Sequence, residues 1–248
     1  MRLLICLAFC FSLTGLELRP VAKNMKTSVI IPCHADHFPL LEHLLNCYAM
    51  QSVVPDEVVI SLSEHQRISS LALDALAQHP WPFALKLLRH TQKYTPGKNR
   101  NEACTHASGD LLICQDADDL PHPQRVEIIR HLFANYNLEH LLHQWLPTGA
   151  SLVGHLAEQA ALACRTFRIY EQIDVLNVHN GSVSFLRTLF DKLHWMPLTG
   201  IHEDVLFNRS AYVFCAHKAV LQWPLLTYRF ELSTFDLDGT KAQRAGYP

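Results

Sequence analysis

Three acidic residues that follow a short apolar run in the middle of the chain have a spacing suited to a divalent cation. Residues 111–115 form the run, and Asp116, Asp118 and Asp119 come directly after it. Such a run predicts a buried strand, and open α/β sheets bind ligands at the carboxyl ends of their strands. Mg²⁺ and Mn²⁺ take oxygen ligands, so one or two carboxylates complete an octahedral shell with phosphate oxygens and water. The pattern predicts a metal–diphosphate site, with a solvated acidic turn as the alternative for an isolated Asp-x-Asp.

The composition fits one globular domain and argues against a nucleic-acid partner. The chain has 248 residues, 49% of them hydrophobic, and a net charge of −2. No block of lysine and arginine recurs along it, so the electrostatic signature of a nucleic-acid-binding protein is missing. The closest histidine spacings, His34/His37 and His140/His143, lack the cysteine or carboxylate partners of zinc sites. We interpret these histidines as surface or helix residues.

The first 24 residues differ from the rest of the chain. Arg2 and the apolar residues 3–16 resemble the first two regions of a signal peptide, but the run is too short to span a bilayer comfortably. Met25 opens directly onto a strand-like sequence. Residues 1–24 are therefore either a signal-like segment or an over-extended start, and residues 25–248 form the domain. No membrane-spanning helix is expected after residue 24.

Cysteines and glycosylation motifs bear on the compartment. Six cysteines follow Met25 at dispersed positions of predicted strands and helices, which is typical of small buried thiols in a reducing compartment. The Asn-x-Ser sequons at Asn180 and Asn208 border the expected site, where a glycan would obstruct it. A cytoplasmic location is favoured, and the secretory pathway applies if residues 1–24 are a genuine signal segment.

Strand-like and helix-like segments alternate along the first half of the chain. We expect strands at residues 27–32, 57–62, 85–90 and 111–115, and helices at residues 38–51, 68–78, 98–107 and 124–136. Farther along we expect short strands at residues 151–155 and 173–178, and helices at residues 184–193 and 202–211. This pattern predicts a single α/β domain with a mainly parallel central sheet, right-handed crossovers and flanking helices.

Four segments are informative through their order and spacing. They are Ser-Val-Ile-Ile-Pro at residues 28–32, Pro-Gly-Lys-Asn-Arg-Asn-Glu-Ala at residues 96–103, the acidic strand with its Ala-Ser-Gly-Asp lead at residues 107–119, and Gly-Ile-His-Glu-Asp at residues 200–204. Together they resemble the family 2 glycosyltransferases with the Rossmann-like GT-A fold, over roughly residues 27–229. The resemblance implies transfer of a sugar from a nucleoside-diphosphate sugar.

The resemblance implies a donor site around the acidic turn. Asp118 would coordinate Mn²⁺ or Mg²⁺, while Asp116 would face the ribose or base and approach the metal. Lys98 and Arg100 lie where a loop enters a helix, so that side-chain cations and the helix N-terminus would hold phosphate. The donor set implied is Pro32, Glu64, Lys98, Arg100, Asn101, Asp116 and Asp118. Two solvent-facing basic residues are the alternative for an isolated Lys-x-Arg.

The chain departs from the family pattern after the second expected strand. Typical members carry Asp-Asp-Gly-Ser there, in which an acid reads the uracil ring, whereas residues 61–66 read Ser-Leu-Ser-Glu-His-Gln. Glu64 is the expected substitute for that acid. The Gln-x-x-Arg-Trp motif of processive polysaccharide synthases is also absent. The comparison therefore implies a transferase that adds a single sugar.

A second acidic pair supplies the expected base. By resemblance, Asp204 takes the proton of the acceptor hydroxyl as its oxygen attacks the anomeric carbon from the face opposite the leaving group, which inverts that centre. Ordinary first-turn acids of a helix are the alternative for Glu203 and Asp204. On the acceptor side we place Gly181, Glu203 and Trp195, next to a saccharide, lipid or protein hydroxyl.

Two other functions compete with an inverting, metal-dependent glycosyltransferase. A nucleotidyltransferase also carries acids at a strand end, but it usually has a glycine-rich, basic signature after the first strand, and residues 33–37 read Cys-His-Ala-Asp-His instead. A catalytically degenerate nucleotide-sugar-binding protein would not require both Asp118 and Asp204. We therefore expect an enzyme.

Overall fold

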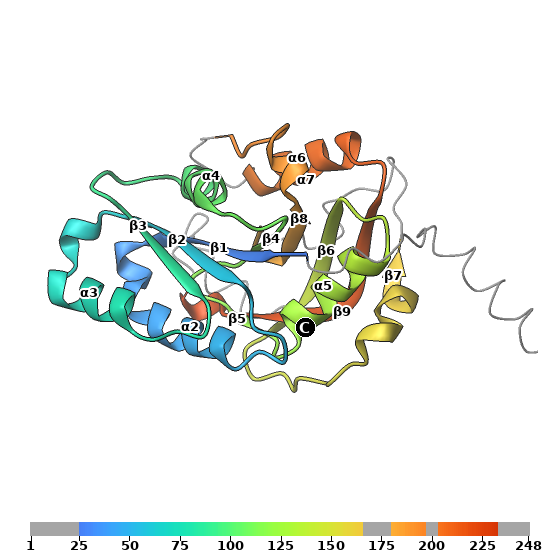
Figure 1. The fold of residues 1–248 in the computed structure, drawn as a ribbon, viewed down its shortest axis with the longest axis horizontal. Helices are drawn as coiled ribbons and strands as arrows, with labels where there is room; N and C mark the ends of the chain where they lie inside the picture. The colour runs from blue at the N-terminus through green and yellow to red at the C-terminus, as the bar shows by residue number, and fades with distance from the viewer. Residues whose placement is uncertain (1–24, 166–179, 197–202, 233–248) are drawn as a thin grey trace, which may run out of the picture.

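The first half of the chain builds the parallel part of one sheet in a computed structural model that describes residues 25–165, 180–196 and 203–232. β1 (Thr27–His34) lies between β2 (Glu57–Ser63) and β4 (Leu111–Cys114), and β3 (Ala84–His90) lies beside β2. All three pairs are parallel (Figure 1). β1, β2 and β4 are almost wholly buried, which explains their continuous apolar sequences.

The second half continues the same sheet with mixed pairing. β8 (Val183–Leu186) lies antiparallel between β4 and β6 (His140–Pro147). β9 (Lys218–Tyr228) is parallel to β6 and antiparallel to both β5 (Leu120–Pro121) and β7 (Cys164–Arg165). The predicted α/β domain with a mainly parallel sheet is therefore confirmed, with antiparallel pairs added in its second half.

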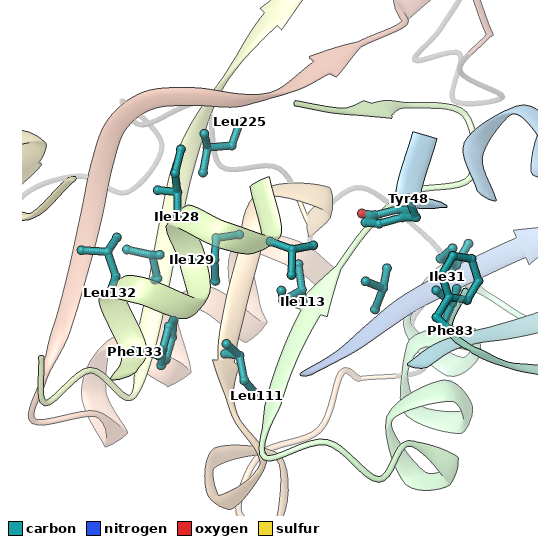
Figure 2. Close-up of a cluster of buried hydrophobic side chains, with 14 of the residues drawn as sticks. Ile31, Tyr48, Phe83, Leu111, Ile113, Ile128, Ile129, Leu132, Phe133 and Leu225 are labelled. Atoms are coloured by element: carbon teal, nitrogen blue, oxygen red, sulfur yellow. The ribbon is translucent and has the colours of Figure 1, made fainter. Parts of the chain in front are cut away.

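Helices cover both faces of the sheet (Figure 1). α2 (Leu41–Ala49), α3 (Ser70–Gln78) and α5 (Arg125–Asn135) pack in one hydrophobic cluster, which includes Val29 and Ile31 of β1. α4 (Pro96–His106) and α7 (Glu203–Phe214) pack in a second cluster, which includes Ile30. Alternate residues of β1 thus face opposite layers, as the period of a strand requires. Figure 2 shows the first cluster between β4 and α5.

The helices of the first half confirm the periodicity prediction, with changes at their ends. The expected helix 38–51 is α2 preceded by the 3-10 turn η1 (Ala35–Leu40), which contains Pro39. A second 3-10 turn, η2 (His65–Arg67), precedes α3. None of the helices in the described ranges has the length and apolar character to span a bilayer.

Several predictions for the second half were wrong. Residues 151–155 are not a strand but an irregular, largely exposed loop that leads to η3 (Ala157–Ala163). The expected helix 184–193 begins with the last three residues of β8, and only the short α6 (Arg187–Phe190) is helical. The expected strand 173–178 lies outside the described residues. The long strands β6 and β9 were not predicted at all.

His140 and His143 were also misread as surface or helix residues. Both lie in β6 and are buried, at 0% and 4% exposure. Nε2 of His140 pairs with Oδ1 of Asn208 at 3.0 Å, and burial lowers the pKa of His140 to about 4. A neutral, hydrogen-bonded histidine is compatible with the core, whereas a charged one is not.

A buried glutamate attaches the loop before β4 to the sheet. The carboxylate of Glu57 accepts hydrogen bonds from Ser28 Oγ at 2.5 Å and Ser108 Oγ at 2.9 Å, and Lys86 Nζ lies 2.9 Å away. Burial alone would raise the pKa of Glu57, but these bonds and one from the Ser108 backbone N–H outweigh it and lower the pKa to about 2. The ionised carboxylate therefore stabilises the folded chain.

Glu57 is expected to contribute an acid-sensitive part of the stability. Because its pKa falls from an ordinary 4.5 to about 2 on folding, about 3 kcal/mol is present above pH 4.5 and is lost as the pH drops toward 2. Urea titrations between pH 2 and 6 should show this slope in the wild type and lack it in Glu57→Gln. The exposed Glu158→Gln serves as the control, and equal slopes in all three proteins would contradict the prediction.

Gly109 is expected to tolerate no side chain. A Cβ there would lie 2.4 Å from Ser28 Oγ and 2.7 Å from the Ser28 backbone nitrogen. Gly109→Ala should therefore lower the free energy of unfolding by about 1–3 kcal/mol, measured in urea. A Cβ on Gly154 has its nearest neighbour at 3.6 Å, so Gly154→Ala is the matched control. Equal stability of the two variants would refute the close approach.

Candidate active site

The acidic turn lies directly after β4, at the carboxyl end of the strand, as predicted. Asp116 and Asp118 are half-buried, and Asp119 is buried. Burial, together with the charge of Asp116, raises the pKa of Asp118 to about 6. Burial and the neighbouring acids also raise the pKa of Asp119 well above its ordinary value. The turn therefore concentrates negative charge in a poorly solvated place, and a bound cation would relieve it.

One arginine joins the acidic turn to the second acidic pair. Arg100, on α4, is 4% exposed, and its Nη2 lies 2.6 Å from Asp116 Oδ1. Its Nη1 lies 2.7 Å from Glu203 Oε1 on α7. Burial alone would lower the pKa of Arg100, but the two carboxylates raise it above its ordinary value, so the side chain stays cationic. Segments more than eighty residues apart in sequence thus meet at one guanidinium.

The N-terminus of α4 is occupied by protein groups. Thr95 Oγ1 accepts a hydrogen bond from the Lys98 backbone N–H at 3.2 Å, and Glu203 Oε2 accepts one from Gly97 N–H at 2.9 Å. A Cβ on Gly97 would lie 2.9 Å from that same Glu203 oxygen, so a glycine permits this approach. In this structure both Arg100 and this helix end hold Glu203, and the expectation that they bind phosphate stays a prediction.

Asp204 lies beside this ion-pair cluster, in the first turn of α7. Its Oδ1 accepts a hydrogen bond from the Val205 N–H at 2.8 Å. Burial raises the pKa of Asp204, while that bond and the charge of Arg100 act to lower it and the charge of Asp116 acts to raise it. The influence of Asp116 and Arg100 places Asp204 in the same electrostatic environment as the acidic turn.

Two residues expected at the site have structural partners. The side chain of Asn101 donates to the Trp195 carbonyl at 2.7 Å and accepts from its N–H at 2.9 Å. The Trp195 ring is 1% exposed and stacks on Phe207 with centroids 3.8 Å apart. Trp195 therefore belongs to the core and offers no face to an acceptor, and Asn101 fixes its backbone. The ammonium of Lys98 lies 3.6 Å from the centre of the Tyr94 ring.

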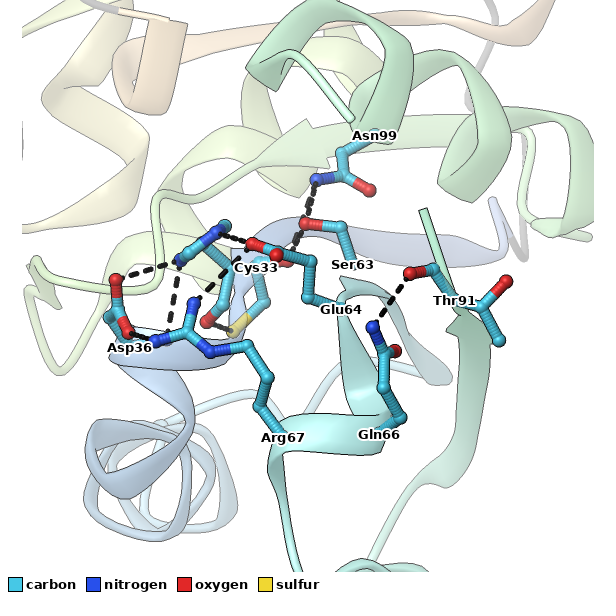
Figure 3. A network of polar contacts seen from close by, with 9 residues as sticks. Cys33, Asp36, Ser63, Glu64, Gln66, Arg67, Thr91 and Asn99 are labelled. Carbon is cyan, nitrogen blue, oxygen red and sulfur yellow. Dashed lines mark hydrogen bonds and ion pairs between the residues drawn. The ribbon is translucent and has the colours of Figure 1, made fainter. Parts of the chain in front are cut away.

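Glu64 lies at the carboxyl end of β2 in a strained backbone conformation, with φ of 56°. Its carboxylate contacts His34 Nε2, and Arg67 Nη1 lies 3.4 Å away. Arg67 also pairs with Asp36 at 2.5 Å, and Figure 3 shows it between the two acids. A non-glycine residue persists at positive φ only where its surroundings impose it. Glu64 is thus held in place, but as part of a network rather than as an isolated acid.

The remaining expected residues lie near the same strand ends. Pro32 is buried in β1, opposite Ser61 of β2. Gly181 lies in η5 (Asn180–Ser182), just before β8, and its carbonyl accepts a hydrogen bond from Arg125. Asn208, one of the two sequon asparagines, is fully buried and donates to the Asp204 carbonyl at 2.9 Å. In this fold Asn208 is therefore inaccessible to glycosylation.

Arg229 contacts the acidic turn from the end of β9. Its backbone N–H donates to Asp119 Oδ1 at 2.9 Å, and its Nε donates to the Asp118 carbonyl. Its charge, like that of His37, lowers the pKa of Asp118 against the effect of burial. Arg229 comes just after β9, more than a hundred residues from the turn, and no local motif marks it.

The carboxylate oxygens of the acidic turn suit a hard divalent cation whose remaining ligands come from a phosphate. Among the described residues no group of three or more His, Cys, Asp or Glu side chains is placed to hold a metal. A structural zinc site needs about four protein ligands, whereas Mg²⁺ or Mn²⁺ needs only one or two carboxylates when phosphate is present. The crowded carboxylates of Asp116 and Asp118 fit the second case.

Comparison with known proteins identifies the family. The model of glycosyl transferase family 2 matches residues 28–193, which span the parallel half of the sheet, the acidic turn and β8. The chain belongs to this family. The predicted family and enzyme class, a glycosyltransferase, are therefore confirmed. No curated protein sequence matches the family 2 chain closely enough to count as a relative.

Solved structures share the fold of this family 2 glycosyltransferase at low identity. TarS residues 1–349 from S. aureus, in complex with UDP, gives a TM-score of 0.66 at 18% identity, over 88% of this chain and 69% of that one. The TarS complex with UDP-GlcNAc gives 0.66 at 20%, over 83% and 58%. The mannosyltransferase PcManGT from Pyrobaculum calidifontis, with GDP-Man and Mn²⁺, gives 0.55 at 18%, over 88% and 62%. These likenesses confirm the GT-A fold.

The Arg100–Glu203 pair is expected to show strong energetic coupling. Arg100→Met should cost about 3–5 kcal/mol, because it leaves two poorly solvated carboxylates unpaired. Adding Glu203→Gln should recover part of that loss, and a double-mutant cycle in urea should give a coupling of roughly 1–3 kcal/mol. The half-exposed pair Arg89–Asp74 is the control, with an expected coupling below about 1 kcal/mol. Additive effects at Arg100 and Glu203 would contradict the prediction.

Proposed function

We propose that the protein is an inverting, metal-dependent glycosyltransferase that moves one sugar from a nucleoside-diphosphate sugar to a hydroxyl acceptor. The observation that carries the proposal is the double ion pair of Arg100, which brings the acidic turn and the Glu203–Asp204 pair into one site. The turn would bind the donor, and Asp204 would act on the acceptor. The acceptor hydroxyl belongs to a saccharide, a lipid or a protein.

The donor half of the site combines the carboxylates of the acidic turn with the guanidinium of Arg229. Asp118, with Asp116, would hold Mn²⁺ or Mg²⁺, which when bound offsets charge on the departing diphosphate. The neighbour PcManGT was solved with GDP-Man and Mn²⁺, which supports this choice of metal. Arg229 is held by the Asp119 carboxylate and the Asp118 carbonyl, and its buried Nη2 has no hydrogen-bond partner within the described ranges. It is therefore the side chain we assign to the diphosphate in place of Arg100.

Asp204 has the surroundings of a general base. Its poorly solvated position strengthens it as a proton acceptor, while Arg100 and the Val205 N–H favour its ionised form. It would remove the proton from the acceptor hydroxyl during attack on the anomeric carbon. Glu203 does not compete for this role, because Arg100 and Gly97 engage both of its oxygens.

The donor base would be read at the ends of β1 and β2. Glu64 and Pro32 lie on this edge of the sheet. The carboxylate of Glu64 is an acceptor for the ring N–H of uracil or guanine, and the contacts with His34 and Arg67 fix its direction.

A cytoplasmic location is part of this proposal, supported by the unpaired state of all six cysteines from Met25 on and by the burial of Asn208.

Substitution of the two central acids should separate binding from transfer. Asp118→Asn is expected to lose Mn²⁺-dependent binding of the donor, because a neutral amide is a weak ligand for a hard cation. Asp204→Asn is expected to keep donor binding and to lose transfer by about 10²-fold or more. Calorimetry, and release of nucleoside diphosphate from UDP-, GDP- and TDP-sugars with Mn²⁺, measure the two effects.

The half-exposed Asp74→Asn is the control for both variants and should behave as the wild type. Wild-type transfer rates in Asp204→Asn would remove the base assignment. Undiminished activity in EDTA would remove the metal.

A further inference from the structure

A fully buried arginine contacts the residues that precede the acidic turn. Arg125 is 0% exposed, and no carboxylate in the described part of the chain forms an ion pair with it. Its Nη1 donates to Gln115 Oε1. Its Nη2 donates to the Cys114 carbonyl at 2.6 Å and to the Gly181 carbonyl. All three acceptors are neutral groups of the segments that border the proposed site.

This position is unfavourable for a cation by ordinary criteria. Arg125 is the first residue of α5, where the helix dipole favours acids. A buried charge is also costly unless strong hydrogen bonds compensate it. Local propensity and packing therefore do not explain an arginine here, whereas three directed contacts from one planar group do.

Gln115 extends these contacts around the acidic turn. Its Nε2 donates to the Asp116 carbonyl at 2.8 Å and to the Asp119 carbonyl at 3.2 Å, so one side-chain amide connects the two ends of the turn. Its Oε1 accepts from Arg125 and from the Tyr48 hydroxyl, the latter at 2.9 Å. Figure 2 shows Tyr48 among the buried side chains of the core. The path of the Asp116–Asp119 backbone is thus fixed by a buried side-chain network.

Arg125 also joins two strands where their pairing stops. The antiparallel register of β4 and β8 ends at Ile113 and Ser184. One residue beyond Ile113, the carbonyls of Cys114 and Gly181 both turn to the same Nη2 of Arg125. The guanidinium therefore replaces the missing ladder bonds and sets how far the two backbones separate at the site.

We propose that Arg125, acting through Gln115, is a positioning residue that fixes the acidic turn relative to the Gly181 segment so that the turn can bind a cation and a nucleoside diphosphate. This inference rests on the proposed function for its ligand, but its structural part stands without one. Loss of the network is expected to leave the carboxylates present and misplaced. Supporting groups behind metal ligands typically change metal affinity by about 10–100-fold.

Three variants and one control test the binding part. Arg125→Met removes all three contacts, and Gln115→Glu replaces the amide donor that closes the turn by a repelling oxygen. Arg125→Lys keeps the charge without the planar fork. We expect the Kd for UDP or GDP with Mn²⁺ to rise at least about tenfold in the first two and less in Arg125→Lys. Leu132→Ala, on the same helix and fully buried, should lose stability and keep the wild-type Kd.

Folded Arg125→Met and Gln115→Glu proteins with wild-type affinity would overturn the proposal, as would an equal loss of affinity in Leu132→Ala. If no binding is detected, or if Arg125→Met folds poorly, hydrogen exchange of the ligand-free proteins still tests the network. In Gln115→Glu and Arg125→Lys, protection should fall at residues 115–119, and in Arg125→Lys also at residues 181–184, with α3 unchanged. Unchanged protection refutes the network. A wild type that binds neither nucleotide refutes the proposed function instead.

Discussion

The site depends on one buried ion-pair cluster, in which Arg100 holds Asp116 with one nitrogen and Glu203 with the other. The two acids belong to different parts of the fold, since one ends the parallel half of the sheet and the other begins α7 in the second half. Without the guanidinium they would repel one another and solvation would draw them apart. Such a cluster adds less to net stability than its short distances suggest, because burying charge is costly. Its main consequence is geometric, since it fixes where Asp204 lies relative to the acidic turn.

This arrangement changes which groups remain for a ligand. Arg100 and the N-terminus of α4 have the chemistry of a phosphate site, but Glu203 occupies both. Arg229 also brings a positive charge beside the turn, where Asp119 and the Asp118 carbonyl hold it. A cation bound to Asp118, together with Arg229, would meet the diphosphate from the turn. In the proposed mechanism one arginine thus builds the site, and another binds the diphosphate.

Local patterns predicted the parts of the fold that local physics determines. β1, β2 and β4 were recognisable because strands buried on both faces read as apolar runs, and the acids after β4 could be placed at the ligand-binding edge. β6 was missed because His140, His143 and Gln144 interrupt its apolar pattern. β9 was missed because Pro224 lies inside it, at a register shift that makes the proline acceptable.

Partnerships between distant residues were not predictable in the same way. Asn101 carries the right chemistry for a ligand, and only the fold shows that it fixes Trp195, ninety-four residues away. The roles of Arg125 and Gln115 likewise depend on where the Gly181 carbonyl comes to lie. In this chain the sequence indicates which side chains have the chemistry to bind a ligand. Tertiary structure determines which of them are instead engaged by other protein groups.

Anomalous diffraction from crystals grown with Mn²⁺ and a nucleoside diphosphate tests most directly whether Asp118 binds the metal while Arg100 holds the two acids together. We expect a manganese peak beside the Asp118 carboxylate, with Arg100 still bound to both Asp116 and Glu203. A peak remote from Asp118, or an Arg100 turned onto the diphosphate with Asp116 and Glu203 moved apart, would contradict this expectation.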